Sequence, residues 1–297
     1  MDGANETMLT NILGSRRVAR DNSKNLLRVI KILFFRWFNL LSLDVVFIAL
    51  AWQEVFARAA VIALRWEERA VLAISIWIVY IADHWLDSKT ESGSTTCFFF
   101  NKAPRHDFVR SHELLFGSLL VLALLVNAWL LTFLFWHLII AGILLACATV
   151  GYLALNYFFL QRGRWLKGRE MMISLIFAIG CALVAMVQAH HPWSLLPWVM
   201  MFAVIAFINC TLIARMERKV PILALAPAWT FSPRWILGWC LLMILFSFFS
   251  PAIVRALCWS LLGLATMPSM ARRFGYEAAS LATDQILFFA ALLALFR

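Results

Sequence analysis

The sequence predicts an all-α fold: a polytopic membrane helix bundle with about nine transmembrane helices. Three observations lead to this fold class. Hydrophobic residues make up 63% of the 297-residue chain and charged residues only 14%, whereas about a quarter of the residues of a soluble domain are charged. The mean hydropathy of +0.84 lies far outside the usual range of soluble domains. Long apolar runs also follow one another with short polar breaks, as in successive membrane spans.

The chain divides into a short basic leader and a membrane domain. Residues 1–31 are polar and basic, and the later part of this leader is suited to a helix lying on the bilayer surface. Residues 32–297 form the predicted membrane domain. A span requires about twenty mainly apolar residues. This criterion predicts nine spans, at 32–57, 69–87, 114–134, 136–160, 170–189, 195–214, 235–250, 252–268 and 279–296.

The basic residues are distributed unevenly between the two sides of such a bundle. With nine spans, twenty of the 26 lysines and arginines fall on the side of the N-terminus. The positive-inside rule therefore predicts a cytoplasmic N-terminus and a C-terminus outside, and a bacterial inner membrane is the expected compartment. The same distribution explains the net charge of +10 without a nucleic-acid partner, because the basic residues lie in short loops.

Two aspartates at the cytoplasmic end of the second predicted span are the most informative residues. Asp83 and Asp87 are four residues apart, which stacks both carboxylates on one helix face, where they repel unless a cation lies between them. Mg²⁺ suits such a pair, because it binds one or two carboxylates together with phosphate oxygens. The alternative is an exposed helix end with two solvated acids.

Basic residues that suit a phosphate-bearing ligand lie on the same predicted side. Arg105 and Arg110 follow the second span, and Lys167 and Arg169 precede or begin the fifth. One arginine side chain can donate two parallel hydrogen bonds to a pair of phosphate oxygens. The alternative is that these residues fix the topology and contact the anionic headgroups of membrane lipid.

Most of the chain resembles the UbiA superfamily of intramembrane prenyltransferases. That family has nine helices, a cytoplasmic N-terminus and an NDxxDxxxD motif at the end of its second helix. The segment YIADHWLD, residues 80–87, matches the last two aspartates of that motif. The segment KGRE, residues 167–170, is similar to the basic segment before the family's fifth helix. The segment FINCTLIARMER, residues 207–218, lies where the family has its second acidic motif.

The resemblance implies a reaction. Diphosphate leaves a polyprenyl diphosphate with the help of Mg²⁺, and a lipophilic or aromatic acceptor then attacks the allylic cation. Mg²⁺ and arginines would neutralise the diphosphate, while an apolar central cavity would hold the prenyl chain and exclude water. The expected metal ligands are Asp83 and Asp87, with Glu217 as a further catalytic acid. The expected substrate-binding residues are Asp44, Arg105, Arg110, Lys167, Arg169 and Asn209.

The sequence departs from the family pattern in both acidic motifs. Val79 and Tyr80 stand where the first motif has Asn and its first Asp. The second motif keeps Glu217 as its only acid, with Asn209 eight residues earlier on about the same helix face. One Mg²⁺ ion or a weaker metal site is therefore expected, and not two ions. The alternative for Glu217 is a surface salt bridge with the neighbouring arginines.

Two further observations concern residues inside the predicted spans. Asp44 is an ionisable group at membrane depth, and such groups usually face the bundle interior; its alternative role is to pair with Arg36 or another helix. Aromatic residues near membrane interfaces often serve as anchors, but their faces also suit a carbocation. The candidates are Trp37, Tyr80, Trp85, Tyr152 and Tyr157.

Two other functions fit the same residues. A non-catalytic relative of the family would bind a lipid or quinone-like molecule in the cavity. A secondary transporter would use Asp44 and Asp83 to bind a coupling ion, but the sequence has no internal repeat of the kind that many transporters have.

Overall fold

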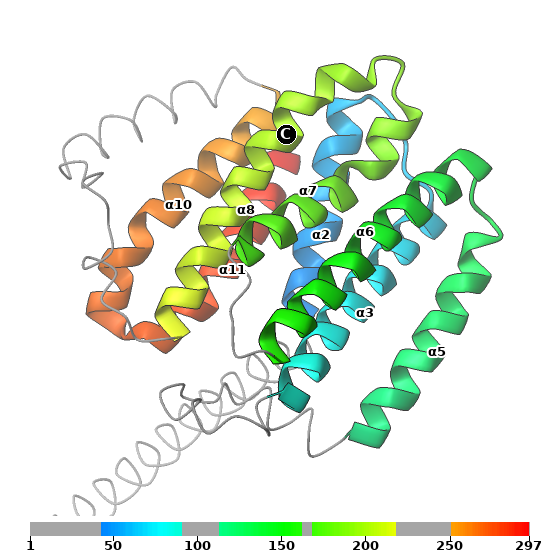
Figure 1. The fold of residues 1–297 in the computed structure, drawn as a ribbon. Helices are drawn as coiled ribbons and strands as arrows, with labels where there is room; N and C mark the ends of the chain where they lie inside the picture. The colour runs from blue at the N-terminus through cyan, green and yellow to red at the C-terminus, as the bar shows by residue number, and fades with distance from the viewer. Residues whose placement is uncertain (1–42, 91–112, 162–167, 218–250, 297) are drawn as a thin grey trace, which may run out of the picture. The chain divides into compact units, whose positions relative to one another are not determined.

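The computed structural model describes residues 43–90, 113–161, 168–217 and 251–296. Within these ranges the chain is helical and has no strand, so the all-α prediction is confirmed there (Figure 1). The helices are α2 (Leu43–Ala59), α3 (Trp66–Thr90), α5 (Glu113–Leu131), α6 (Trp136–Gln161), α7 (Arg169–Gln188), the short 3-10 helix η2 (Pro192–Leu195), α8 (Leu196–Glu217), α10 (Ala252–Phe274) and α11 (Tyr276–Leu295).

Every described α-helix coincides with a predicted span. Four helical stretches are long and apolar enough to cross a membrane: Leu114–Leu131, Trp136–Phe159, Arg169–Gln188 and Pro192–Met216. The apolar stretches of α10 and α11 are shorter, Ala252–Met267 and Ala282–Leu295. The predicted span at 235–250 and the basic leader at 1–31 lie outside the described residues. The structure therefore supports a multi-pass membrane protein, and the number of nine spans remains a prediction.

Two glycines set where helices begin. Gly168 has a φ of +87°, a left-handed conformation that glycine adopts without steric cost. The chain can therefore turn directly into α7, which places Arg169 in the first turn of that helix. Gly275, with a φ of +92°, separates α10 from α11 in the same way.

The core lies where α2, α7, α8, α10 and α11 meet. At its centre the rings of Trp52 and Phe202 stack at 3.9 Å, and Phe56 and Phe177 contact the Phe202 ring from two other directions. The indole N–H of Trp52 donates to the carbonyl of Leu287 at 3.2 Å. This bond satisfies the polar atom of the buried indole, so α2 and α11 are joined inside an apolar core.

The helices α5 and α6 contribute little to this core. Helix α5 packs on α3, and α6 packs on α7 and α3. Most of their large apolar side chains are exposed, as at Leu114, Leu125 and Leu144. Apolar helices with all backbone bonds satisfied internally are suited to contact with lipid.

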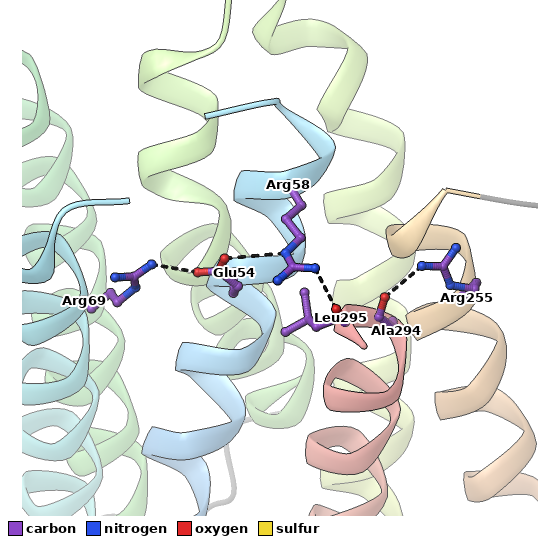
Figure 2. Close-up of polar contacts among 6 residues, drawn as sticks. All are labelled: Glu54, Arg58, Arg69, Arg255, Ala294 and Leu295. Carbon is purple, nitrogen blue, oxygen red and sulfur yellow. Dashed lines mark hydrogen bonds and ion pairs between the residues drawn. The ribbon is translucent and has the colours of Figure 1, made fainter. Parts of the chain in front are cut away.

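Polar contacts join the helices at the end where α2 and α11 finish (Figure 2). Arg58 donates to the carbonyl of Leu295 at 2.7 Å, and Arg255 donates to that of Ala294 at 2.9 Å. These bonds satisfy carbonyls in the last turn of α11, which have no partner within their own helix. Glu54 forms ion pairs with Arg58 at 3.6 Å and with Arg69 at 3.0 Å. We refer to this end, where the predicted topology places the outside, as the outer end.

Candidate functional site

A buried ion pair joins α3 and α7 near the opposite end of these helices. Arg169 Nη2 lies 2.8 Å from Asp83 Oδ2, and the two side chains are 18% and 8% exposed. Arg169 Nε also donates to the hydroxyl of Tyr152 on α6 at 3.3 Å. Side chains from α3, α6 and α7 therefore meet at one guanidinium group.

The surroundings explain why the two charges lie together. An ionised side chain inside a membrane protein is costly unless an opposite charge or hydrogen bonds accompany it. Sequence reasoning assigned Asp83 to a metal site and Arg169 to a phosphate group on the same side, and the structure brings the two side chains together. The partner seen for the Asp83 carboxylate is a guanidinium group, whereas the sequence predicted a metal ion shared with Asp87.

Tyr80 lies one helical turn before Asp83 and connects it to other helices. Its hydroxyl interacts electrostatically with the Cys210 thiol on α8 and with the carboxylates of Asp284 on α11, Asp44 on α2 and Asp83 on α3. Carboxylates from three helices therefore contribute to the electrostatic environment of one phenol. The expectation that Asp44 faces the bundle interior agrees with this position, since Asp44 is 6% exposed.

The helices α8 and α11 are joined by a second polar contact. Asn209 Nδ2 donates to Asp284 Oδ1 at 2.8 Å. The Asn209 side chain is buried, and its own oxygen, Oδ1, accepts no hydrogen bond from any described residue. The thiol of Cys210, the next residue, lies beside the hydroxyl of Ser174 on α7. We call Asp44, Tyr80, Asp83, Tyr152, Arg169, Asn209 and Asp284 the polar cluster.

Sequence reasoning missed Asp284. The signal was present, because Asp284 is an acid within the last predicted span, and an ionisable residue at membrane depth is a candidate site residue. It was overlooked because no neighbouring acid or basic residue forms a motif with it. Its partner Asn209 lies 75 positions away along the chain.

The other predicted site residues are described in part or not at all. Asp87 lies in the last turn of α3, and Glu217 ends α8, but their side chains are outside the described set. Arg105, Arg110 and Lys167 also lie outside the described residues. Among the side chains that the structure describes, no group of three or more His, Cys, Asp or Glu residues is arranged to hold a metal ion. Metal binding by Asp83 and Asp87 therefore remains a prediction.

The polar cluster combines groups of different chemical character. Arg169 offers a guanidinium group to an anion, Tyr80 and Tyr152 offer phenol hydroxyls, and Asp284 and Asn209 offer oxygens to a donor or a cation. The seven residues of the cluster come from six helices and lie among largely apolar segments. Comparison of the chain with protein-family models, with curated proteins and with solved structures finds no match.

Proposed function

We propose that this protein is a UbiA-like intramembrane prenyltransferase, which transfers a prenyl group from a polyprenyl diphosphate to an aromatic or lipid acceptor with the help of Mg²⁺. The observation that carries the proposal is the buried contact between Asp83 and Arg169. Both residues belong to segments that resemble the family, one at 80–87 and the other at 167–170. On this proposal the chain has nine spans and a cytoplasmic N-terminus.

The position of Arg169 suits a diphosphate group. Arg169 stands in the first turn of α7, where unpaired backbone N–H groups already favour an anion. Its guanidinium adds a full positive charge at that place. In the proposed complex Arg169 binds diphosphate oxygens, and Lys167, Arg105 and Arg110 add further positive charge. These contacts stabilise the negative charge that develops on the leaving group.

The donor set fits Mg²⁺ in chemical type. Carboxylate oxygens such as those of Asp83 and Asp87 are ligands that Mg²⁺ prefers, and bound Mg²⁺ would further neutralise the diphosphate. Asp83 would then be shared between the metal and Arg169. Glu217 would act as a further acid, while Asp44 and Asn209 would contact the organic part of the substrates.

A turnover assay tests this proposal. The purified protein is reconstituted with Mg²⁺, labelled polyprenyl diphosphates and a membrane lipid extract as the source of acceptors. We expect transfer to fall by at least about a hundredfold in Asp83→Asn and Asp87→Asn, as is common when a group that stabilises the transition state is removed. Glu54→Gln is the matched control, because this carboxylate pairs with arginines at the outer end. Transfer that survives both aspartate changes would overturn the assignment.

A second candidate function is a non-catalytic protein that binds a lipid or quinone-like molecule. It is favoured by the state of Asp83, whose carboxylate is engaged by Arg169. The same preparation distinguishes the two functions. Saturable prenyl binding without release of diphosphate, unchanged in the Asp83 and Asp87 variants, would favour the second.

A further inference from the structure

The amide of Asn209 has an unused hydrogen-bond acceptor in the middle of the bundle. Asn209 is 5% exposed, and its Nδ2 group is used by Asp284 at 2.8 Å. Its Oδ1 atom is buried and has no partner among the described residues. A buried oxygen that accepts no hydrogen bond costs free energy, so such atoms in native structures usually mark a missing water or ligand.

A second hydrogen-bond acceptor, the carboxylate of Asp284, lies beside the Asn209 amide. Asp284 contacts the same amide group and carries a carboxylate, which accepts hydrogen bonds when ionised. Two neighbouring acceptors suit one molecule that donates a hydrogen bond. They disfavour an anion, because the carboxylate repels it, and they gain nothing from an ether, which has no hydrogen to donate.

Although Asn209 belongs to the polar cluster, its neighbours along α8 are apolar. Ile205, Ala206 and Ile208 precede it and Leu212 follows it, and all four belong to or pack against the hydrophobic core. A molecule that reaches Asn209 therefore leaves water for an apolar region, which favours a long hydrocarbon body with a single small polar head.

We propose that Asn209 and Asp284 form a subsite that binds a neutral, hydroxyl-bearing lipophile through its O–H group and rejects an anionic head. The inference rests on the proposed function in one respect: the bound molecule is taken to be the prenyl acceptor. Under that function Asn209 and Asp284 decide which acceptor is used, while Asp83 and Arg169 hold the diphosphate. Binding at the subsite itself requires neither Mg²⁺ nor a prenyl diphosphate.

Three probes of equal chain length separate the possible ligands. The full-length protein is purified in detergent, and binding of dodecan-1-ol, dodecyl methyl ether and dodecanoate is counted by native mass spectrometry. We expect the alcohol to bind at least about tenfold more tightly than the ether or the acid, the size of effect that one hydrogen bond to a buried or charged acceptor produces. Equal binding of the three probes would mean that water alone meets Asn209 Oδ1, and would overturn the proposal.

Two variants and a matched control locate the effect. Asn209→Leu should abolish the preference for the alcohol. Asn127→Leu should keep it, although Asn127 on α5 also donates through Nδ2, to Ser75 at 3.0 Å, and also has a buried Oδ1 without a described partner. The two amides differ in their hydrogen-bond partners, because Asn127 donates to a hydroxyl group and Asn209 donates to a carboxylate. A preference that survives Asn209→Leu, or is lost equally in both variants, would overturn the proposal.

Asp284→Asn keeps an oxygen in place while it removes the charge. In this variant the alcohol should still bind, and dodecanoate should gain at least about threefold in affinity because the repelling charge is gone. No gain for dodecanoate would contradict the role given to Asp284.

Failure of this inference can be told apart from failure of the proposed function. Normal transfer activity with equal binding of the three probes would remove only the subsite. A preference for the alcohol that depends on Asn209, in a protein that transfers no prenyl group, would support the subsite and remove only the enzyme.

Discussion

Buried polar side chains in this bundle form contacts that cross from one helix to another. Arg169 meets Asp83, Asn209 meets Asp284, and Gln188 meets Glu68. A polar group in an apolar interior costs free energy unless a partner accompanies it. Each such contact therefore fixes how two helices are rotated about their axes, which apolar packing alone specifies less strictly.

The pair of Asp83 and Arg169 should be energetically coupled. Asp83→Asn alone should lower the free energy of unfolding by about 2–4 kcal/mol, because it leaves a largely buried guanidinium without this carboxylate. Arg169→Gln should have a similar effect. In the double variant the losses should fall short of their sum by about 1–3 kcal/mol. Unfolding by titration with SDS in mixed micelles measures all three variants, and additive losses would show that the contact contributes no coupling.

Glu68 should contribute to stability at the outer end. Its carboxylate accepts from the backbone N–H of Arg65 at 2.9 Å and from Gln188 Nε2 at 2.6 Å. The first bond caps α3, since Arg65 precedes the helix and Glu68 is its third residue. Glu68→Ala should lower the free energy of unfolding by about 1–3 kcal/mol.

The matched control for Glu68 is Arg69→Ala at the same end of α3. The Arg69 side chain is 46% exposed and pairs with Glu54, and exposed ion pairs contribute about 0–1 kcal/mol. The same SDS titration compares the two variants. Equal losses would mean that burial of Glu68 and its cap add nothing beyond an ordinary surface charge.

The sequence predicted some of these residues and missed others for physical reasons. Asp83 and Arg169 could be found, because acids one turn apart and basic residues at a span end are visible locally. Asp284 and its partner Asn209 come together only through the packing of α8 on α11. The predicted second span begins at 69 and leaves Glu68 outside it, whereas the structure buries Glu68 against Gln53 of α2 and Gln188 of α7.

At the scale of elements, the length of the apolar runs predicted the position of every described helix. The exact ends of the helices depend instead on polar residues near their termini. α3 begins at Trp66, three residues before the predicted span, because Glu67 and Glu68 lower the hydropathy but are favourable in the first turn of a helix. α10 continues to Phe274, past the predicted end at 268, through the basic residues Arg272 and Arg273. Such residues suit a helix C-terminus although they do not suit lipid.

Among the described glycines, Gly263 permits the closest contact between two helices, α10 and α11. A Cβ atom added at Gly263 would lie 3.2 Å from Cγ1 and 3.3 Å from Cβ of Ile286 on α11, and closer still to its Cγ2. Ile is branched at Cβ and cannot easily turn aside. Gly263→Ala should therefore separate the two helices and cost about 1–3 kcal/mol of unfolding free energy.

Gly151→Ala on α6 is the control for that change. A Cβ atom at Gly151 would meet nothing within 4 Å, and alanine is the better helix former by about 1 kcal/mol. This variant should unfold at the same temperature as the parent protein or a slightly higher one. Thermal melts of the two variants in detergent compare them, and a loss at Gly151 equal to that at Gly263 would contradict the packing argument.

At the scale of the whole molecule, polar groups of different kinds lie at two levels along the helices. The outer end holds Arg58, Arg69 and Arg255, which contact Glu54 and the last carbonyls of α11. The polar cluster, with Asp83 and Arg169, lies toward the other end. A substrate with a charged head and an apolar body matches such a division, because the Arg169 side chain in the polar cluster is 18% exposed, whereas those of Arg58, Arg65 and Arg69 at the outer end are 45%, 41% and 46% exposed.

The orientation of this arrangement in the membrane follows from the basic residues. On the predicted nine-span topology, twenty lysines and arginines lie on the side of the N-terminus and few on the other side. Transferring the twenty across the bilayer is far less favourable than transferring the few. The positive-inside rule therefore predicts that the proposed diphosphate site opens to the cytoplasm and that the Glu54 contacts face outward. Two positions report the orientation: Trp193, 78% exposed in η2 at the outer end, and Cys97, which lies outside the described residues in the loop predicted to be cytoplasmic.

Two single-cysteine proteins test the orientation, one with Trp193→Cys and the six native cysteines replaced, the other keeping only Cys97. A membrane-impermeant maleimide applied to intact cells should label the cysteine at position 193. It should label Cys97 only after the membrane is made permeable, because the charge of the reagent keeps it out of the bilayer. The reverse pattern would place the polar cluster toward the outside. A cytoplasmic supply of prenyl diphosphate could then not reach Arg169, and the proposed function would fail even with the helix bundle intact.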